Sequence, residues 1–355
     1  MNNLSPNFSI PARLVVATTL AALGATPALA QNATKPGVMS LTTTDEKADL
    51  DGDKKWSASV SIETSIGIGT FLSEPHRQSA VSTTFVPSFG YDLGHAMSLS
   101  AGLSVTWYQL LGFGTPLSEH DVLMSDVSVG FNHGSIWKHE GSGFNLSGSL
   151  SFFLPTSLAS QFQNRLFTLK PSLRASIPVG PVTFGYTLGF GKFFNLTATP
   201  TVDCEDFDNP DECIAGRRDN PDFGFESVRR GAEVYLPGMG TSSFYVQNAF
   251  SARWGIVEGL SLNLGISIFN NFGVRSQPED GFTNAHAQAG RAQVDRLVSS
   301  LSLSYQLLKE LSVATSLVTA TARPFGADGN DFVIFDFSRA ASNITSWNIS
   351  VTGSL

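Results

Sequence analysis

Acidic side chains and a cysteine pair are concentrated in one short segment of this sequence, DCEDFDNPDEC. Its carboxylates are Asp203, Glu205, Asp206, Asp208, Asp211 and Glu212. Carboxylate oxygens are the ligands that Ca²⁺ prefers, so the segment is a candidate calcium site, and the same composition equally suits a solvated acidic loop without an ion. Cys204 and Cys213 lie within the run. In an oxidising compartment such a pair predicts one disulfide, which would stabilise the fold by about 3 kcal/mol in the chain-entropy model.

A second set of ionised side chains is spread over the chain on the polar side of alternating segments. Its members are Glu63, Asp92, Lys170, Arg174, Arg253 and Arg296. They share this side mainly with serine, threonine, glycine, asparagine and glutamine, so together they would line an enclosed polar interior. Positive groups held in a low-dielectric wall favour anions. The alternative is that these charges pair across the interior and only hold it together.

Alternation of apolar and polar residues recurs from Trp56 to the final segment, Asn343 to Leu355. In that segment Trp347, Ile349 and Val351 are separated by polar residues. A period of two predicts strands with one apolar and one polar face, and a final strand has an edge that needs a partner. The segment resembles the closing strand of bacterial outer-membrane β-barrel proteins. That resemblance implies pairing of the last strand with the first and recognition by the barrel-assembly machinery.

The first 30 residues have the features of a secretory signal peptide. Arg13 precedes an apolar stretch, and the small-residue site ending at Ala30 predicts cleavage before Gln31. The rest of the sequence has no apolar run long enough for a transmembrane helix. Charged residues make up only 15%, while Gly (33) and Phe (27) are abundant, which favours strands between lipid and lumen over a soluble exported domain. The net charge of −8 argues against nucleic acid as a partner.

The alternating segments number twelve. We therefore predict an all-β fold, a twelve-stranded antiparallel up-and-down transmembrane β-barrel formed by residues 56–355 and preceded by a flexible periplasmic segment, 31–55. The outer links include a long loop at 197–240, and the inner links include 94–95, 132–143 and 178–181. We expect Pro171 to cause a local bulge, because proline removes a backbone donor from the ladder.

Aromatic residues fall at both ends of the predicted strands, as the two interfaces of a membrane would select. Trp56, Tyr91, Trp254 and Tyr305 lie near the periplasmic ends, and Trp107, Phe194, Phe272 and Trp347 lie near the outer ends. A soluble β-sandwich or propeller with an aromatic core is the alternative, and it leaves the low charge unexplained.

One short motif, Phe131-Asn132-His133-Gly134-Ser135, resembles the His-x-Ser element of outer-membrane phospholipases and lipid A deacylases. The resemblance implies that the imidazole of His133 would activate the hydroxyl of Ser135 for acyl transfer. That family continues with Asn-Gly after the serine, whereas Ile136 follows here, and the pair falls in a predicted periplasmic turn. The remaining histidines lack ligand spacing, so apart from the calcium candidate no cofactor is predicted.

The sequence thus predicts an outer-membrane β-barrel that passes small polar, preferably anionic, solutes and contacts outer-membrane lipids. It favours a non-enzymatic porin or channel. Two alternatives stay open: a lipid acyl hydrolase that uses His133 and Ser135, and a structural or adhesive barrel that displays the acidic loop.

Overall fold

Antiparallel strands make up almost all of the chain that the structure, a computed structural model, describes. The described residues are 55–67, 81–110, 122–197, 201–203, 228–230, 233–235, 241–274, 293–321, 334–335 and 343–355. The first half contains β1 (Trp56–Gly67), β2 (Val81–Gly94), β3 (Met97–Gly102), β4 (Val105–Leu110), β5 (Val122–Met124), β6 (Val127–His139), β7 (Phe144–Leu154), α1 (Leu158–Phe162), β8 (Arg165–Val179) and β9 (Val182–Asn195). The second half contains β13 (Ser242–Val257), β14 (Leu260–Gly273), β15 (Gln293–Leu308), β16 (Leu311–Thr321) and β17 (Asn343–Ser354).

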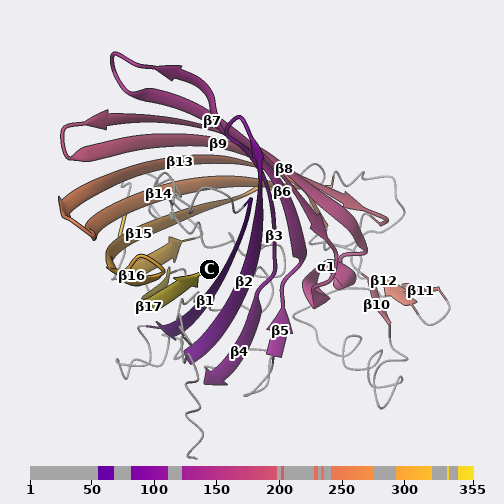
Figure 1. Ribbon diagram of the computed structural model, residues 1–355. Helices are drawn as coiled ribbons and strands as arrows, with labels where there is room; N and C mark the ends of the chain where they lie inside the picture. Colours follow the sequence, from indigo (N-terminus) through magenta and orange to yellow (C-terminus); the bar gives the residue numbers. More distant parts are fainter. Residues whose placement is uncertain are drawn as a thin grey trace, which may run out of the picture.

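The sheet closes on itself through β1, which pairs with β2 on one side and with β17 on the other (Figure 1). Ile62, for example, is paired with Phe85 of β2 and with Val351 of β17. Closure pairs β1 along both of its edges, as a lipid environment requires because hydrocarbon cannot hydrogen-bond to backbone groups. The predicted pairing of the first and last strands is therefore confirmed.

Two of the membrane strands are each built from two shorter pieces. β2 pairs first with β4 and then with β3, while β3 pairs with β6 and β4 with β5. The break between β3 and β4 lies near Pro87, whose carbonyl accepts from the backbone N–H of Leu103. β3 and β4 together span the wall once, and so do β5 and β6. The fourteen strands of the sheet therefore form a twelve-stranded barrel, as predicted.

The strands are inclined to the barrel axis. One row of paired residues starts at Gly67, at the outer end of β1, and reaches Asn145, at the inner end of β7. Its members are Gly67, Ser346, Val318, Ser300, Gly265, Ser251, Gly185, Ser176 and Asn145. A closed sheet needs such a stagger. All members face the lumen, and most of them are small.

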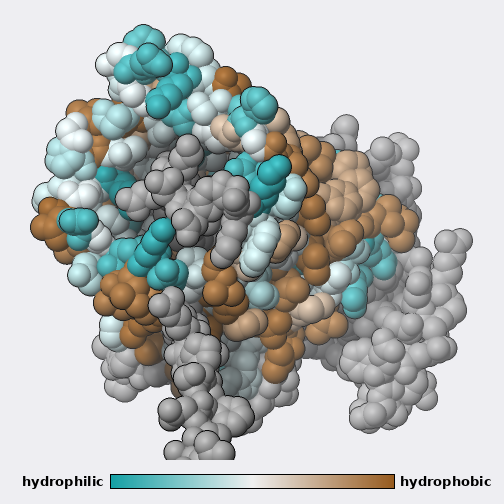
Figure 2. Space-filling model, in the orientation of Figure 1, coloured by the Kyte–Doolittle hydropathy of each residue, from teal (hydrophilic) through white to brown (hydrophobic). Residues whose placement is uncertain are grey.

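Large apolar side chains cover the exterior. Figure 2 shows hydrophobic residues gathered over the middle of the wall, with hydrophilic residues towards the hairpin tip at the upper left. At the outer end, Phe167 stacks between Phe152 and Phe194, with ring centroids 5.0 and 4.3 Å away. At the inner end Trp56 is paired with Tyr91, and both are exposed. These rings form the two aromatic belts of a membrane barrel.

Two local predictions were wrong. The link predicted at 132–143 is shorter, because β6 continues to His139 and only residues 140–143 turn. A register shift between His133 and Trp137 explains the error, since extra residues in one strand interrupt the alternation. No shift occurs at Pro171, which pairs with Leu150 in register. Instead, pairing with β9 is missing at residues 170 and 171, so the ladder accommodates the proline without a bulge.

The long outer loop contributes a separate small sheet of β10 (Thr201–Asp203), β12 (Glu233–Tyr235) and β11 (Val228–Arg230). The acidic segment otherwise lies outside the described residues, as do Cys204 and Cys213, residues 1–30 and residues 31–54. The only helix that the structure describes is α1, and it is too short and too polar to span a membrane.

Candidate functional site: the barrel lumen

Hydroxyl groups coat most of the lumen wall and bond to one another across neighbouring strands. The Oγ of Ser61 lies 2.7 Å from the Oγ1 of Thr352, and the hydroxyls of Ser149 and Ser172 are also 2.7 Å apart. Buried residues in the described part of the chain are correspondingly mostly polar. The interior is therefore a water-compatible surface rather than an apolar core.

The predicted basic residues share the lumen face of one part of the wall. Lys170 and Arg174 on β8 are paired with Ser151 and Ser147 of β7. Arg253 on β13 is paired with Asn263, and Arg296 on β15 is paired with Phe269. In the ring of strands β8 lies nearly opposite β1, so Lys170 and Arg174 are across the barrel from Glu63.

The two predicted carboxylates have different surroundings. Glu63 on β1 is 3% exposed and lies between its paired residues, Thr84 and Ser350. Asp92 is exposed near the inner end of β2, and its Oδ1 accepts the backbone N–H of Gly94 at 2.7 Å. Asp92 therefore holds the β2–β3 turn, whereas Glu63 is set into the wall.

Lys170 has unusual neighbours for a lysine. Its Nζ lies 4.1 Å from the ring centroid of Phe153 and 5.8 Å from that of Tyr245. Within the described part of the chain, the ammonium makes no hydrogen bond and no ion pair. Tyr245 is on β13, two strands away from β8, so the contact also shows that both side chains project into the same lumen.

Glycines on β9 provide the space in which the large lumen side chains lie. A Cβ added to Gly191 would fall 2.0 Å from Cε1 of Tyr245, and one added to Gly189 would fall 3.1 Å from Oε1 of Gln247. At Gly185 the same atom would be 3.7 Å from the Nε of Arg174. These side chains therefore lie against the β9 backbone from both sides, and the missing Cβ atoms keep them close to the wall.

Aromatic rings continue this surface across three strands, β9, β13 and β14. Phe193 on β9 is 2% exposed and lies 5.8 Å from Tyr245, whose centroid is 5.9 Å from that of Phe269 on β14. These rings were not predicted from the sequence as lumen-site residues. Their signal is nevertheless present, because each occupies a lumen-facing position that elsewhere holds mainly small polar residues.

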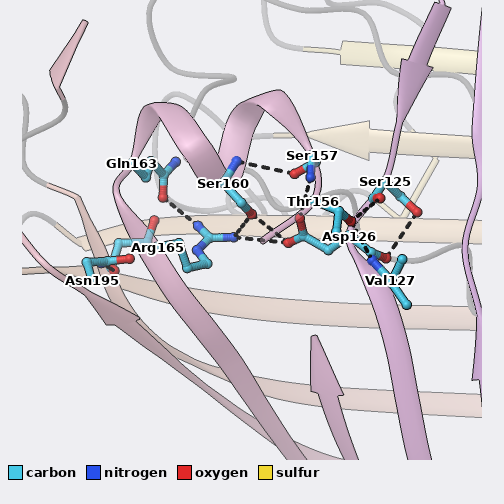
Figure 3. Close-up of polar contacts among 10 residues, drawn as sticks. Ser125, Asp126, Val127, Thr156, Ser157, Ser160, Gln163, Arg165 and Asn195 are labelled. Atoms are coloured by element: carbon cyan, nitrogen blue, oxygen red, sulfur yellow. Dashed lines mark hydrogen bonds and ion pairs between the residues drawn. The ribbon is translucent and has the colours of Figure 1, made fainter. Parts of the chain in front are cut away.

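A buried ion pair fixes the outer link 155–164 (Figure 3). Arg165 donates from Nη1 to the Oγ of Ser160 at 3.0 Å and from Nη2 to the Oε1 of Gln163. The same Nη1 lies 3.8 Å from Oδ2 of Asp126. The guanidinium also lies over Phe193, with Cζ 4.4 Å from the ring centroid. Because Phe193 faces the lumen, Arg165 faces it too.

Helix α1 is attached through the same carboxylate. Oδ1 of Asp126 accepts the backbone N–H of Ser157 at 2.9 Å, and Oδ2 accepts the hydroxyl of Ser160 at 2.5 Å. The Oγ of Ser157 caps the helix by accepting the backbone N–H of Ser160. This cluster therefore holds the link against the lumen side at the outer end. Sequence reasoning missed it, although serine followed three residues later by serine is compatible with a helix cap.

His133 and Ser135 lie on either side of Gly134 in the irregular part of β6. The Nδ1 of His133 is buried and has no hydrogen-bond partner, and no hydrogen bond joins it to Ser135. The described residues also bring no three histidine, cysteine, aspartate or glutamate side chains together as a metal site would require. Within the described residues, therefore, His133 and Ser135 are not assembled as a catalytic pair, and no group of metal ligands is present.

A closed antiparallel sheet of twelve strands, a lipid-compatible exterior with two aromatic belts, and a hydroxyl-lined interior define a transmembrane β-barrel whose fold resembles that of outer-membrane porins. No protein-family model and no curated protein matches this chain.

Three solved structures of similar fold are distant from this chain in sequence. The chain is similar to the NanC porin (8% identity, TM-score 0.41, covering 83% of this chain and 100% of that chain). It is also similar to an outer membrane channel from Pseudomonas putida F1 (10% identity, TM-score 0.45, covering 84% and 95%). A third is the KdgM porin in complex with disordered oligogalacturonate (9% identity, TM-score 0.40, covering 84% and 99%).

Proposed function

We propose that this protein is a pore that lets small polar solutes cross the outer membrane and favours anions over cations. The observation that carries the proposal is the set of lumen cations without counter-ions. The side chains of Lys170, Arg174 and Arg296 make no hydrogen bond or ion pair in the described structure, whereas Arg165 donates to Ser160 and Gln163 and lies beside Asp126. Fixed positive charges that are not neutralised internally attract mobile anions.

The hydroxyl coating supports passage rather than tight retention of solutes. Serine and threonine side chains bonded to each other across strands present weak, replaceable partners to water and to solutes. The glycine positions on β9 keep larger side chains against the wall. An anion would therefore meet an unpaired cation without a strong competing ligand in the same wall.

Planar-bilayer recording tests the proposal directly. Refolded protein should produce stepwise conductance, and under a tenfold gradient of KCl the reversal potential should have the sign of chloride selectivity. Because exposed fixed charges are screened by salt, the selectivity should be largest at low ionic strength. Oligogalacturonate, named for one of the similar structures, is a suitable acidic solute for a second measurement. No conductance from correctly folded protein would refute the pore.

A matched pair of variants assigns the selectivity. Arg174→Gln removes an unpaired lumen charge, and Lys309→Gln removes a charge from the β15–β16 turn. Arg174→Gln should shift the reversal potential towards zero, while Lys309→Gln should leave it unchanged. Equal effects would show that net charge, rather than the lumen, determines ion preference.

We further propose that export precedes insertion. The predicted signal peptide would be removed before Gln31, the barrel-assembly machinery would insert the barrel among outer-membrane lipids, and Cys204 and Cys213 would form a disulfide in the outer loop. N-terminal sequencing of membrane-extracted protein should begin at Gln31. A mass increase only after reduction and alkylation would support the disulfide, and alkylation without reduction would refute it.

A further inference from the structure

We propose that Lys170, Phe153 and Tyr245 form a binding site for a carboxylate carried on a ring. The inference rests on the proposed pore and names the class of solute that one part of its wall recognises. It assigns a specificity role to three side chains on β7, β8 and β13 that lie around one unpaired cation.

The ammonium of Lys170 supplies the charge recognition. It has three N–H donors, and none is used in a hydrogen bond or ion pair within the described chain. The side chain is half-buried and is flanked by the rings of Phe153 and Tyr245. Aromatic faces stabilise a cation but accept no strong hydrogen bond from it, so the donors stay available to an oxyanion.

The rings supply recognition of the body that carries the carboxylate. Phe153 comes from β7, on one side of β8, and Tyr245 comes from β13, on the other side, and the aromatic surface continues from Tyr245 to Phe269. Phe153 and Phe269 are both half-buried, so part of each ring remains accessible in the lumen. A ring-shaped solute that places its carboxylate at Lys170 could therefore pack its faces or edges against neighbouring aromatic carbon.

The other two basic residues on β8 lack one part of this combination. Arg165 lies over Phe193, but its guanidinium is occupied by Ser160 and Gln163. The side chain of Arg174 is unpaired in the described chain, but it lies beside Gly185 and makes no contact with a described aromatic ring. Of these three basic residues on β8, only Lys170 therefore combines an available charge with two aromatic neighbours.

The test compares block of single-channel potassium chloride current by benzoate, cyclohexanecarboxylate, glucuronate and acetate. Benzoate should halve the time-averaged current at a concentration at least about tenfold below that of acetate, equivalent to about 1.4 kcal/mol of preferential binding. Cyclohexanecarboxylate and glucuronate have rings that are not flat, and glucuronate adds hydroxyls. If these two acids block as well as benzoate, the site prefers any ring acid. If they block only as well as acetate, the site prefers a flat aromatic ring.

Variants separate the two recognition elements. Lys170→Gln should abolish block by every carboxylate, Lys170→Arg should retain it, and Phe153→Leu should bring benzoate to the level of acetate. Arg174→Gln is the control and should preserve the benzoate-to-acetate ratio. Conductance by each variant shows that it has folded.

The two proposals fail in different ways. If wild-type protein conducts but benzoate and acetate block equally, or if Lys170→Gln leaves benzoate block unchanged, the ring-carboxylate site is refuted and the pore remains. If wild-type protein does not conduct, the pore itself is refuted, and the ring-carboxylate site falls with it.

Discussion

Substitution of Gly191 by alanine tests whether the β9 glycines hold the lumen open. The added Cβ would lie 2.0 Å from Cε1, 2.4 Å from Cζ and 2.6 Å from Cδ1 of Tyr245. Carbon atoms pack at about 3.5–4.0 Å, so the ring must retreat by about 1.5 Å or more. Phe193 and Phe269 lie to either side of it, with centroids 5.8 and 5.9 Å away. The direction left to the ring is away from the wall, into the lumen.

Two measurements follow from this displacement. Overpacking costs about 1–3 kcal/mol, so the urea midpoint of the refolded Gly191→Ala barrel should fall. Its single-channel conductance should fall as well, because the tyrosine ring would occupy part of the open cross-section. Tyr245→Ala combined with Gly191→Ala removes the clash and should restore both the midpoint and the conductance.

Gly255 provides the matched control. It also faces the lumen, on β13, but a Cβ added there would meet no heavy atom within 4 Å. Gly255→Ala should therefore leave conductance and stability close to wild type. If Gly191→Ala and Gly255→Ala behave alike in both assays, the argument that glycine keeps Tyr245 against the wall is wrong.

Three further predictions concern the wall itself. Leu301→Lys places a charge on the lipid face and should reduce stability in bilayers by about 2–4 kcal/mol, whereas Ser302→Lys, one residue along and lumen-facing, should have little effect; equal urea midpoints would contradict the assigned faces. Cysteines replacing Ser61 and Thr352, which are paired across the closing seam, should cross-link under mild oxidation, and failure to do so by gel mobility would argue against that register. Asp126→Asn removes the carboxylate charge beside a buried guanidinium and should increase proteolysis within 155–164 by loosening α1; unchanged proteolysis would show that the ion pair does not hold the link.

The closing strand and the lumen charges were predictable because a period of two assigns faces without knowledge of neighbours. Ile349 and Val351 had to share one face of β17 whatever strand lay beside them, and the twelve-stranded fold that follows is confirmed. The same rule assigned Lys170 and Arg174 to the polar face. Their effect on solutes stays a prediction, because the alternation shows on which face of the strand a side chain lies but not which groups surround it.

The sequence could not locate the irregular part of β6, because a register shift hides alternation between His133 and Trp137. Nor could it show that Asp126 and Arg165 meet through α1, since that contact depends on the path of a link.

The sequence by itself determined the faces of the strands, and through them the class of fold. Only the tertiary structure decided that Tyr245 lies over Gly191 and beside Lys170, three residues on three strands. Faces follow from local backbone geometry, whereas neighbours follow from the register of strands that are distant in sequence.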